Sequence, residues 1–413
     1  MRVSTSTIFD ANVASMTQNE SKLLHTQQQV SAGRRILTPA DDPVGASRAL
    51  ELTQSDAAIT QYAKNIDAVQ NSLALSESTL GSVTTLLQDI RTTAVNAGNT
   101  GPMNNAERKS LAAGLQGNLD QLIALANSTD GLGNYLFSGF QGRTQPFVKA
   151  ATVQYMGDDG QRLNQVNATR QLASNDSGAD IFMRIKNGNG TFATQADPTS
   201  NGGAGNAGSG LISQGNVTNP TLLTGDSYRI DFAVAAGVTT YTVTDTTNPA
   251  NPINGTTGNY VSGQAIIFDG MQFNVQGAPA NGDQFTVVPS ANESIFKTIS
   301  DLINTLNTPV IPGNVASTTQ MTAGVGRALD GLDNGLNNVL TARASLGTRL
   351  QEIDSLKTTG EDLSMQYKQA LSQLQDLDYT KAITDLTQQK TMLDAAQKSF
   401  LQIQNLSVFN YMP

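Results

Sequence analysis

The chain has 413 residues, a formal net charge of −9 and only 14% charged residues. Cysteine is absent and His25 is the single histidine, which excludes disulfides, thiolate metal sites and any metal or catalytic site that needs two imidazoles. The acidic balance disfavours a nucleic-acid binder, because phosphate contacts need clustered Lys and Arg, and the lack of a long apolar run argues against membrane insertion.

Residues 9–30 predict an amphipathic helix. Its apolar positions alternate at steps of four and three, with polar Glu20 and Gln27 in the same row. The apolar members are Phe9, Val13, Met16, Leu23 and Val30, with Leu24 beside them. A helix with polar residues in its seam is marginal alone, so we expect it to form fully only when packed against a partner. Gly33 suits the left-handed position that ends a helix.

A second, much longer helix is predicted from Pro43 to about Gly98. Asp42 is its expected N-cap and Pro43 its first residue, where the missing N–H costs nothing. A seven-residue repeat then runs through Leu52, Ile59, Ile66, Leu73, Leu80, Leu87 and Ala94, with a companion row at Ser55, Tyr62, Val69, Ser76, Val83, Ile90 and Ala97. This is the seam of a coiled coil about 80 Å long, which needs a partner helix of similar length.

The next segments change from helix to strand. Asn104 and Glu107 resemble a capping box, and the spacing that follows predicts a third helix of about 23 residues that folds back on the long one. From Asn134 to about Ser290 the apolar residues alternate between turns rich in Gly, Asn and Asp, which predicts antiparallel β-structure. The segments 225–230 and 282–287 echo one another, each a Gly-Asp turn that enters an alternating strand.

Helix returns in the C-terminal third. A short helix is expected over Ser294–Leu306, and a proline-containing linker follows over Thr308–Asn314. A second seven-residue repeat then passes through Leu332, Val339, Leu346, Ile353, Gly360, Tyr367 and Leu374, although four glycines weaken it. After a break at Asp376–Asp378, a final helix carries a stripe through Ala382, Leu386, Gln389, Leu393, Ala396, Phe400 and Ile403.

These elements predict an α+β fold, with a long antiparallel helical coiled-coil rod built from both chain ends and a central antiparallel β insert domain. Pairing of the two long seams within one chain is the simplest arrangement, and pairing between chains fits the same heptads. The expected divisions are an N-terminal helix in 1–40 that pairs with 379–413, rod halves in 41–139 and 291–378, and the insert in 140–290.

No catalytic, cofactor or metal site is expected. Gly203, Gly205 and Gly208 match the spacing of a dinucleotide fingerprint, but no strand precedes them and no helix follows. A catalytic His25 is disfavoured against a packed or solvated one. The acidic residues that could serve a glycosidase, Asp158, Asp159, Asp176 and Asp180, are more simply explained as turn-forming and solubilising residues.

The two terminal stripes are the candidate functional surface. Their polar faces hold Gln, Ser, Thr and Asn rather than Lys and Arg, which disfavours a membrane-surface helix. Packing of the two stripes within one monomer and packing between subunits remain equally open from the pattern. Burial of one leucine is worth about 1.5–3 kcal/mol, so a stripe interrupted by polar residues gains more in a continuous array than in one pair.

Several motifs resemble a known family. The run Gln29–Ile36, with Gly33, Arg35 and Ile36, and the run Pro39–Pro43, with Asp41 and Asp42, are similar to the N-terminal signature of bacterial flagellins and their hook-associated relatives. Pro43 is more similar to the hook-associated proteins than to the flagellins. The run Tyr135–Gly139 with Pro146-Phe147 and the ending Asn405–Met412 are similar to the hook-associated protein 3 family of hook–filament junction proteins. The similarity covers about residues 1–147 and 290–413, and more loosely the insert.

The resemblance implies a structural protein of the flagellum, secreted through the flagellar type III apparatus without a cleaved signal peptide. Its implied partners are its own copies in a ring, hook-associated protein 1, flagellin and an export chaperone at the C-terminal helix. The implied role is a junction adaptor between hook and filament, with the terminal helices innermost and the insert outward. A filament flagellin is the alternative, and an adhesin or surface enzyme carried on the insert is a third hypothesis.

Overall fold

The structure, a computed structural model, describes residues 5–99, 103–249 and 257–405. The chain divides into two compact units. One is formed by residues 1–66, 166–168 and 354–413, and the other by residues 67–165 and 169–353. Two long helices, α2 (Pro43–Asn99) and α6 (Val315–Gln375), contribute residues to both units.

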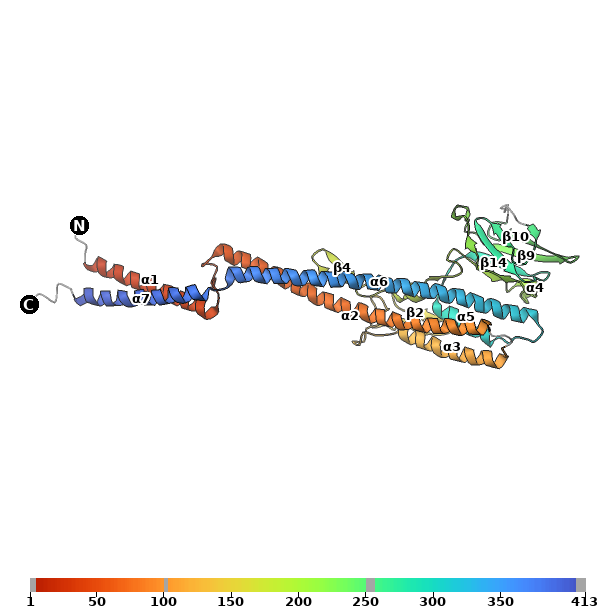
Figure 1. Ribbon diagram of the computed structural model, residues 1–413, viewed down its shortest axis with the longest axis horizontal. Helices are drawn as coiled ribbons and strands as arrows, with labels where there is room; N and C mark the ends of the chain where they lie inside the picture. Colours follow the sequence, from red (N-terminus) through yellow and green to blue (C-terminus); the bar gives the residue numbers. More distant parts are fainter. Residues whose placement is uncertain (1–4, 100–102, 250–256, 406–413) are drawn as a thin grey trace, which may run out of the picture. The chain divides into compact units, whose positions relative to one another are not determined.

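The first unit pairs the two terminal helices, α1 (Thr5–Ala32) and α7 (Tyr379–Asn405), side by side (Figure 1). The pair is antiparallel: the rings of Phe9 and Phe400 lie 5.2 Å apart at one end. At the other end, a Cβ added to Gly33 would lie 2.9 Å from the hydroxyl of Tyr379. In the same unit, Ser364 of α6 donates a hydrogen bond to Asp56 of α2 at 2.6 Å.

In the second unit the two predicted seams meet within one chain. From Val69 to Ala97 every seam position of α2 is buried, and so are the matching α6 positions Leu332, Val339 and Leu346. Arg343 binds Glu77 at 2.6 Å and Arg91 binds Asp333 at 2.5 Å, so α2 and α6 run antiparallel. The intrachain alternative is therefore the one that the structure contains.

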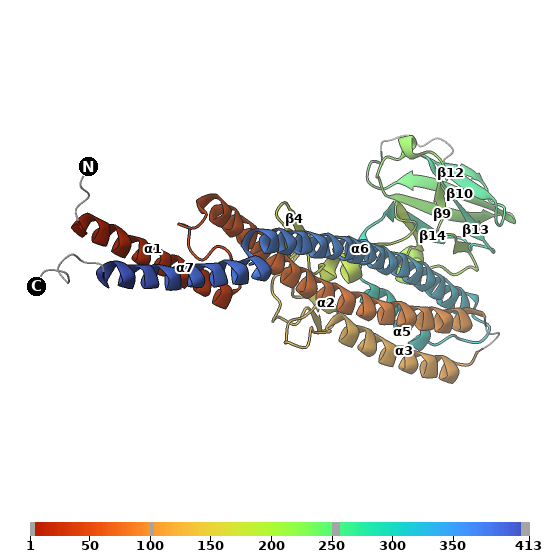
Figure 2. The ribbon, with the colours of Figure 1, turned by 60° about the vertical axis from the view of Figure 1, so that its left-hand side comes forward.

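Two shorter helices, α3 (Asn105–Ala126) and α5 (Ile295–Asn307), pack against each other beside the long pair (Figure 2). The predicted capping box of α3 is complete, with Asn104 and Glu107 as its two members. Ser294, which was expected to be the first residue of a helix, is the N-cap of α5 and accepts a hydrogen bond from the Lys297 N–H.

The glycines of α6 have a packing reason that their weak helix propensity did not suggest. A Cβ on Gly324 would lie 2.6 Å from Thr305, and one on Gly335 would lie 2.4 Å from Ile295. These glycines therefore allow α5 to approach the α6 backbone closely.

Between α3 and the main sheets, the chain forms short strands and loops around an aromatic cluster. The strands pair as β1 (Phe147–Lys149) with β2 (Val153–Tyr155), β3 (Leu163–Asn167) with β4 (Arg170–Ala173), and β5 (Ile185–Lys186) with β15 (Asn292–Glu293). A π-helical turn, η1 (Ala179–Met183), lies among them. The ring of Phe147 lies 5.4 Å from Phe182 and 5.2 Å from Phe296 of α5, which anchors this region on the helices. These short strands were not predicted individually.

The rest of the insert is two antiparallel sheets that share one core (Figure 2). The five-stranded sheet has the order β11-β10-β9-β14-β6, with β6 (Phe192–Ala196), β9 (Tyr228–Ala235), β10 (Val238–Asp245), β11 (Thr257–Asn259) and β14 (Gln284–Pro289). The second sheet joins β12 (Ala265–Phe268), β13 (Met271–Gln276), β7 (Leu211–Ile212) and β8 (Asn216–Val217). The single turns α4 (Ser200–Gly203) and η2 (Pro220–Leu222) lie in the connections.

The predicted alternation is confirmed in the core of the sheets. Tyr228, Ile230 and Phe232 of β9 point inward, as do Phe285 and Val287 of β14. The two echoing segments become neighbours, with Phe285 opposite Ile230. Their aspartates differ, because Asp283 is fully buried and accepts backbone hydrogen bonds, whereas Asp226 is only half-buried.

Across the described ranges, no helix has both the length and the apolar character needed to cross a membrane.

Candidate assembly interface

The inner face of α7 follows the predicted stripe. Ala382 is buried, and Leu386, Leu393, Ala396 and Phe400 are half-buried at the expected spacing. Gln389 also lies on this face, and its Oε1 is buried without a hydrogen-bond partner among the described residues. The side chain of Ile403 lies outside the described residues.

The inner face of α1 agrees with the prediction in one row and differs in the other. Met16, Leu23 and Val30 are half-buried at steps of seven. The companion row is shifted by one residue: Val13 is exposed, as are Glu20 and Gln27. Their places are taken by Asn12, Asn19 and Thr26, of which Thr26 is buried.

The shift has a simple geometric reason. A position three residues after Phe9 and one four residues after it lie on opposite flanks of the same row, so the heptad alone does not choose between them. Val13 favoured the wrong flank. The signal that indicates the right one is the recurrence of short polar residues, Asn12, Asn19 and Thr26, at steps of seven.

Because the seam is partly polar, large apolar side chains remain on the outside of the pair. On α1 these are Val13 and Leu24, which are 41% and 53% exposed, whereas Phe9 is 45% exposed but keeps its ring against Phe400 of α7. On α7 they are Ile383, Met392 and Leu401, which the sequence analysis missed. A shallow groove on α7 is lined by Ile383, Thr384, Thr387, Gln388, Thr391 and Met392.

The family-signature residues form a joint between the two helix connectors. The Arg35 N–H donates to the carbonyl of Gln375 at 2.7 Å, and the Leu377 N–H donates to the carbonyl of Gly33 at 3.2 Å. The Arg35 guanidinium also donates to the carbonyl of Leu374 at 3.0 Å and to Asp42 at 3.2 Å. One arginine therefore ties the start of α2 to the end of α6.

The paired aspartates complete this joint. Asp41 accepts hydrogen bonds from the N–H groups of Leu37 at 2.9 Å and Thr38 at 2.8 Å, and His25 Nε2 lies 2.9 Å from it. The backbone bonds from Thr38 and Leu37, and then His25, lower the pKa of Asp41 to about 2. Asp42 is the N-cap of α2, as predicted, and accepts a hydrogen bond from the Gly45 N–H at 2.9 Å. This bond lowers the pKa of Asp42.

The remaining signature residues set the path of the backbone. Gly33 has φ of +66°, the left-handed conformation expected after a helix. Ile36 lies against Gly45, where an added Cβ would approach its Cδ1 to 2.8 Å. Pro43 opens α2 as its first residue, as predicted.

The alternative chemical sites are occupied by structural contacts. Asp159 and Asp180 both bind Arg184, and Asp176 binds Arg349. Asp158 accepts hydrogen bonds from the N–H groups of Phe140, Gln141 and Gly160. The fingerprint-like loop directs its Ala207 and Gly208 N–H groups to Asp283, which leaves them unavailable to a phosphate. Over the described ranges, no cluster of three or more His, Cys, Asp or Glu side chains could hold a metal ion.

Both helical ends of the chain are similar to known protein families. Residues 3–142 match the bacterial flagellin N-terminal helical region, and residues 329–412 match the bacterial flagellin C-terminal helical region. These matches, with paired terminal helices and a β insert between them, define a protein of the flagellin class.

Relatives that match nearly the whole chain show which members of the flagellin class it is similar to. The chain is 29% identical to flagellar hook-associated protein 3 of Salmonella typhimurium over 99% of both chains. It is also similar to two solved structures. The flagellar junction protein FlgL from Legionella pneumophila is 30% identical with a TM-score of 0.70, and the match covers 81% of this chain and 100% of that one. FlgL from Xanthomonas campestris is 30% identical with a TM-score of 0.69, and the match covers 78% of this chain and 99% of that one.

The chain therefore belongs to the family of flagellar hook-associated protein 3, the hook–filament junction proteins. It is a structural component of the extracellular flagellum and not an enzyme. The chain assembles with other flagellar components.

Proposed function

We propose that this chain forms a ring of subunits that joins the hook, through hook-associated protein 1, to the first flagellin subunits of the filament. The observation that carries the proposal is that large apolar side chains remain exposed on the outside of the α1–α7 pair. Val13 and Leu24 of α1 and Ile383 and Met392 of α7 remain about half exposed on the outside of the pair. Such a surface is typical of an element that is buried by association.

The proposed mechanism is coupled folding and polymerisation. The seam between α1 and α7 gains little from Asn12, Asn19 and Gln389, so the pair has limited stability by itself. Each outward apolar side chain that a neighbour covers would add about 1.5–3 kcal/mol, and the sum over an array orders both helices together. We assign this self-assembly role to both stripes, including Ile403.

We also propose a division of labour along the chain. Residues 1–40 and 379–413 polymerise, residues 41–139 and 291–378 supply the helical support, and residues 140–290 form the outward insert. The joint built by Gly33, Arg35 and Asp42 holds the polymerising pair to that support. In the same proposal, an export chaperone covers the α7 surface before secretion through the flagellar type III apparatus, since the exposed groove on α7 offers an apolar binding surface.

Deletion of residues 383–413 tests the mechanism in cells that lack the native chain. We expect the insert and long helices to stay folded, as measured by circular dichroism, while the protein no longer enters the flagellum. The finer variant pair is Ile383→Ser with Met392→Ser, against Gln397→Ser as a matched control on the exposed side of α7. The proposal is wrong if filaments grow normally on the truncated protein or on the double variant.

Two alternatives have separate tests. A filament flagellin would be present along the whole filament, so its copy number per flagellum would be far higher than that of a ring. An adhesin or surface enzyme on the insert would require the full chain to bind or cleave a polysaccharide or host surface, and that binding would be lost when residues 191–290 are deleted.

A further inference from the structure

The strand β6 leaves one edge of the five-stranded sheet open. It pairs with β14 on one side only, and Asp197 N–H donates to the carbonyl of Gln284 at 2.9 Å. Because backbone groups alternate along a strand, the N–H and C=O groups of Thr194 and Ala196 point away from β14. Within the described part of the chain, these four backbone groups have no hydrogen-bond partner.

Two cavities lie along this open edge, both within the second unit. One, of about 470 Å³, is bounded by β6, by α5 and by α6, with Gln195, Asp301 and Asp330 in its wall. The other, of about 400 Å³, continues past Ala196 toward Gly205 and Gln320. The two share Gln195, Thr305, Thr308 and Arg327, so they form one trough beside the strand. Their volumes lie in the range of ligand sites, about 300–1,000 Å³.

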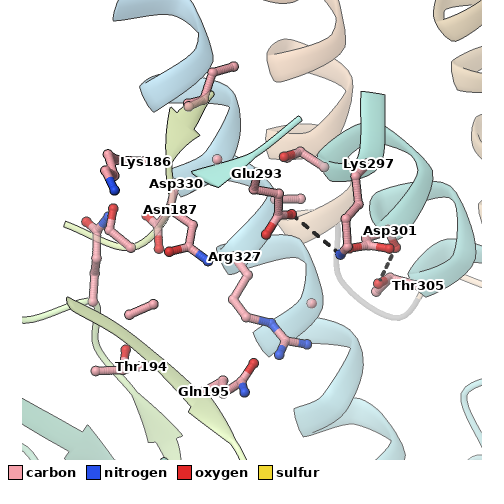
Figure 3. Close-up of a pocket in the computed structure, with 18 of the residues that line it drawn as sticks. Lys186, Asn187, Thr194, Gln195, Glu293, Lys297, Asp301, Thr305, Arg327 and Asp330 are labelled. Atoms are coloured by element: carbon pink, nitrogen blue, oxygen red, sulfur yellow. Dashed lines mark hydrogen bonds and ion pairs between the residues drawn. The ribbon is translucent and has the colours of Figure 1, made fainter. Parts of the chain in front are cut away.

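Arg327 stands where the two cavities meet. Figure 3 shows its side chain extending from α6 toward Gln195 and the strand. No carboxylate of the described residues forms an ion pair with Arg327.

The other charges of the trough are arranged differently. The nearby acids, Glu293 of β15 and Asp301 of α5, are already engaged, since Lys297 lies 3.6 Å from Glu293 and 2.5 Å from Asp301. The Lys186 ammonium also has no ion pair among the described residues. Two acidic side chains of the wall, Asp330 in the first cavity and Asp197 in the second, likewise have no basic partner there. The unpaired guanidinium of Arg327 is the positive charge at the point where the two cavities meet, and it favours an anionic group at that point.

We propose that this trough binds an extended, acidic peptide segment of another protein, which adds to β6 as a further strand. The open N–H and C=O groups of Thr194 and Ala196 supply the main-chain hydrogen bonds, and Arg327 receives the carboxylate of a Glu or Asp side chain. Addition of a strand to an exposed sheet edge is a recurring mode of peptide recognition, in which the backbone gives affinity and side-chain contacts give specificity. This site uses neither α1 nor α7 and does not depend on the proposed assembly mechanism.

The test measures binding of a fluorescein-labelled, end-blocked peptide, Thr-Val-Glu-Val-Thr, to the full chain by fluorescence polarisation. Arg327→Gln removes the charge. Ala196→Pro removes the open N–H and keeps the ladder to β14, because that N–H takes no part in the ladder. Arg48→Gln, an exposed arginine of α2 in the other unit, is the matched control. The same peptide with Gln in place of Glu tests the carboxylate from the ligand side.

We expect saturable binding that falls about tenfold with Arg327→Gln, by a similar factor with the Gln peptide, and severalfold with Ala196→Pro, while Arg48→Gln has no effect. Circular dichroism of each variant confirms that the sheet is intact. The proposal is overturned if no saturable binding occurs at millimolar peptide or if Arg327→Gln leaves the affinity unchanged. It is also overturned if N-acetylglutamate amide binds as tightly as the peptide, since that result would mean a site for a free carboxylate.

Discussion

At the scale of single residues, the joint between the connectors depends on carboxylates that must stay ionised. Asp41 holds the loop through the N–H groups of Leu37 and Thr38, and Asp42 caps α2 through Gly45. Both carboxyls have a lowered pKa, which for Asp41 is about 2. A lowered pKa means that ionisation stabilises the folded joint, and that this contribution is present above the ordinary pKa of about 4.

We therefore expect the joint to loosen as the pH falls from about 4 toward 2. Amide hydrogen exchange at Leu37 and Thr38, corrected for the intrinsic pH dependence, should become faster relative to amides in the middle of α2. Asp41→Asn should show the faster exchange already at pH 7 and should change little on acidification. Equal protection of these two amides at pH 5 and pH 2 in the native chain would contradict the assignment.

The pKa of Asp330 is shifted in the opposite direction, upward. Asp330 is partly buried in the α6 wall of the trough, and burial, with the nearby Asp333 as the second cause, raises its pKa to about 6. A raised carboxyl pKa means that ionisation costs stability in the folded state, so stability falls as the pH rises from about 4 through 6. Lys186 and Arg327 also line this cavity, and neither pairs with Asp330 among the described residues.

Asp330→Asn should accordingly stabilise the protein at pH 7.5 by about 1 kcal/mol, a value reduced for the partial exposure of the group, and should have almost no effect at pH 3.5. Thermal unfolding of the two proteins at both pH values measures the difference. Asp301→Asn is a useful control, because it removes an exposed partner of Lys297 on the other wall and should not stabilise the chain at either pH. A pH-independent effect of Asp330→Asn would contradict the raised pKa.

At the scale of elements, α7 has two apolar faces with different tasks. Leu393 is half-buried against α1, whereas its neighbour Met392 is 51% exposed on the outer face. The sequence stripe predicted the first face and not the second, because periodicity identifies one continuous row and Ile383 and Met392 are too widely spaced to form one.

Leu393→Ala should destabilise the α1–α7 pair by about 1–2 kcal/mol, a part of the cost of removing a fully buried leucine, and Met392→Ala should cost less than about 0.5 kcal/mol. Helicity of the isolated chain at 222 nm during thermal melting measures this difference. In polymerisation assays the two variants should rank the other way round. Met392→Ala should have the larger effect and should lower the yield of assembled protein, although its monomer is intact. If Met392→Ala assembles as well as the native chain, the outer face is not the interface.

At the scale of the whole molecule, the element order was largely predictable. The helices, the cap of α2 at Asp42 and that of α3 at Asn104, the alternating strands and the breaks at Gly33 and Asp376 all follow from local rules that act within a few residues. Their partners were less certain, since a heptad seam indicates that a helix is paired and not which helix pairs with it. The paired charges Arg343–Glu77 and Arg91–Asp333 lie 266 and 242 residues apart in sequence, beyond the reach of any local pattern.

The parts that could not be predicted share a physical cause. The residues of α1 that face α7, and the edge of β6 that stays open, both depend on which side of the helix or strand packs against a neighbouring element. That choice is made by tertiary packing, and the sequence pattern leaves it nearly balanced. The resemblance to the flagellin family indicated the class from the signature around Gly33–Pro43, but it carried no information about these flanks.

A junction protein lies at one level of the flagellum, between hook and filament. Immunogold labelling of isolated flagella, combined with quantitative mass spectrometry of the chain relative to flagellin, measures that position and the copy number together. We expect label confined to the hook–filament boundary and a copy number on the scale of one or two ring layers per flagellum. Label distributed along the filament, with a copy number approaching that of flagellin, would contradict it.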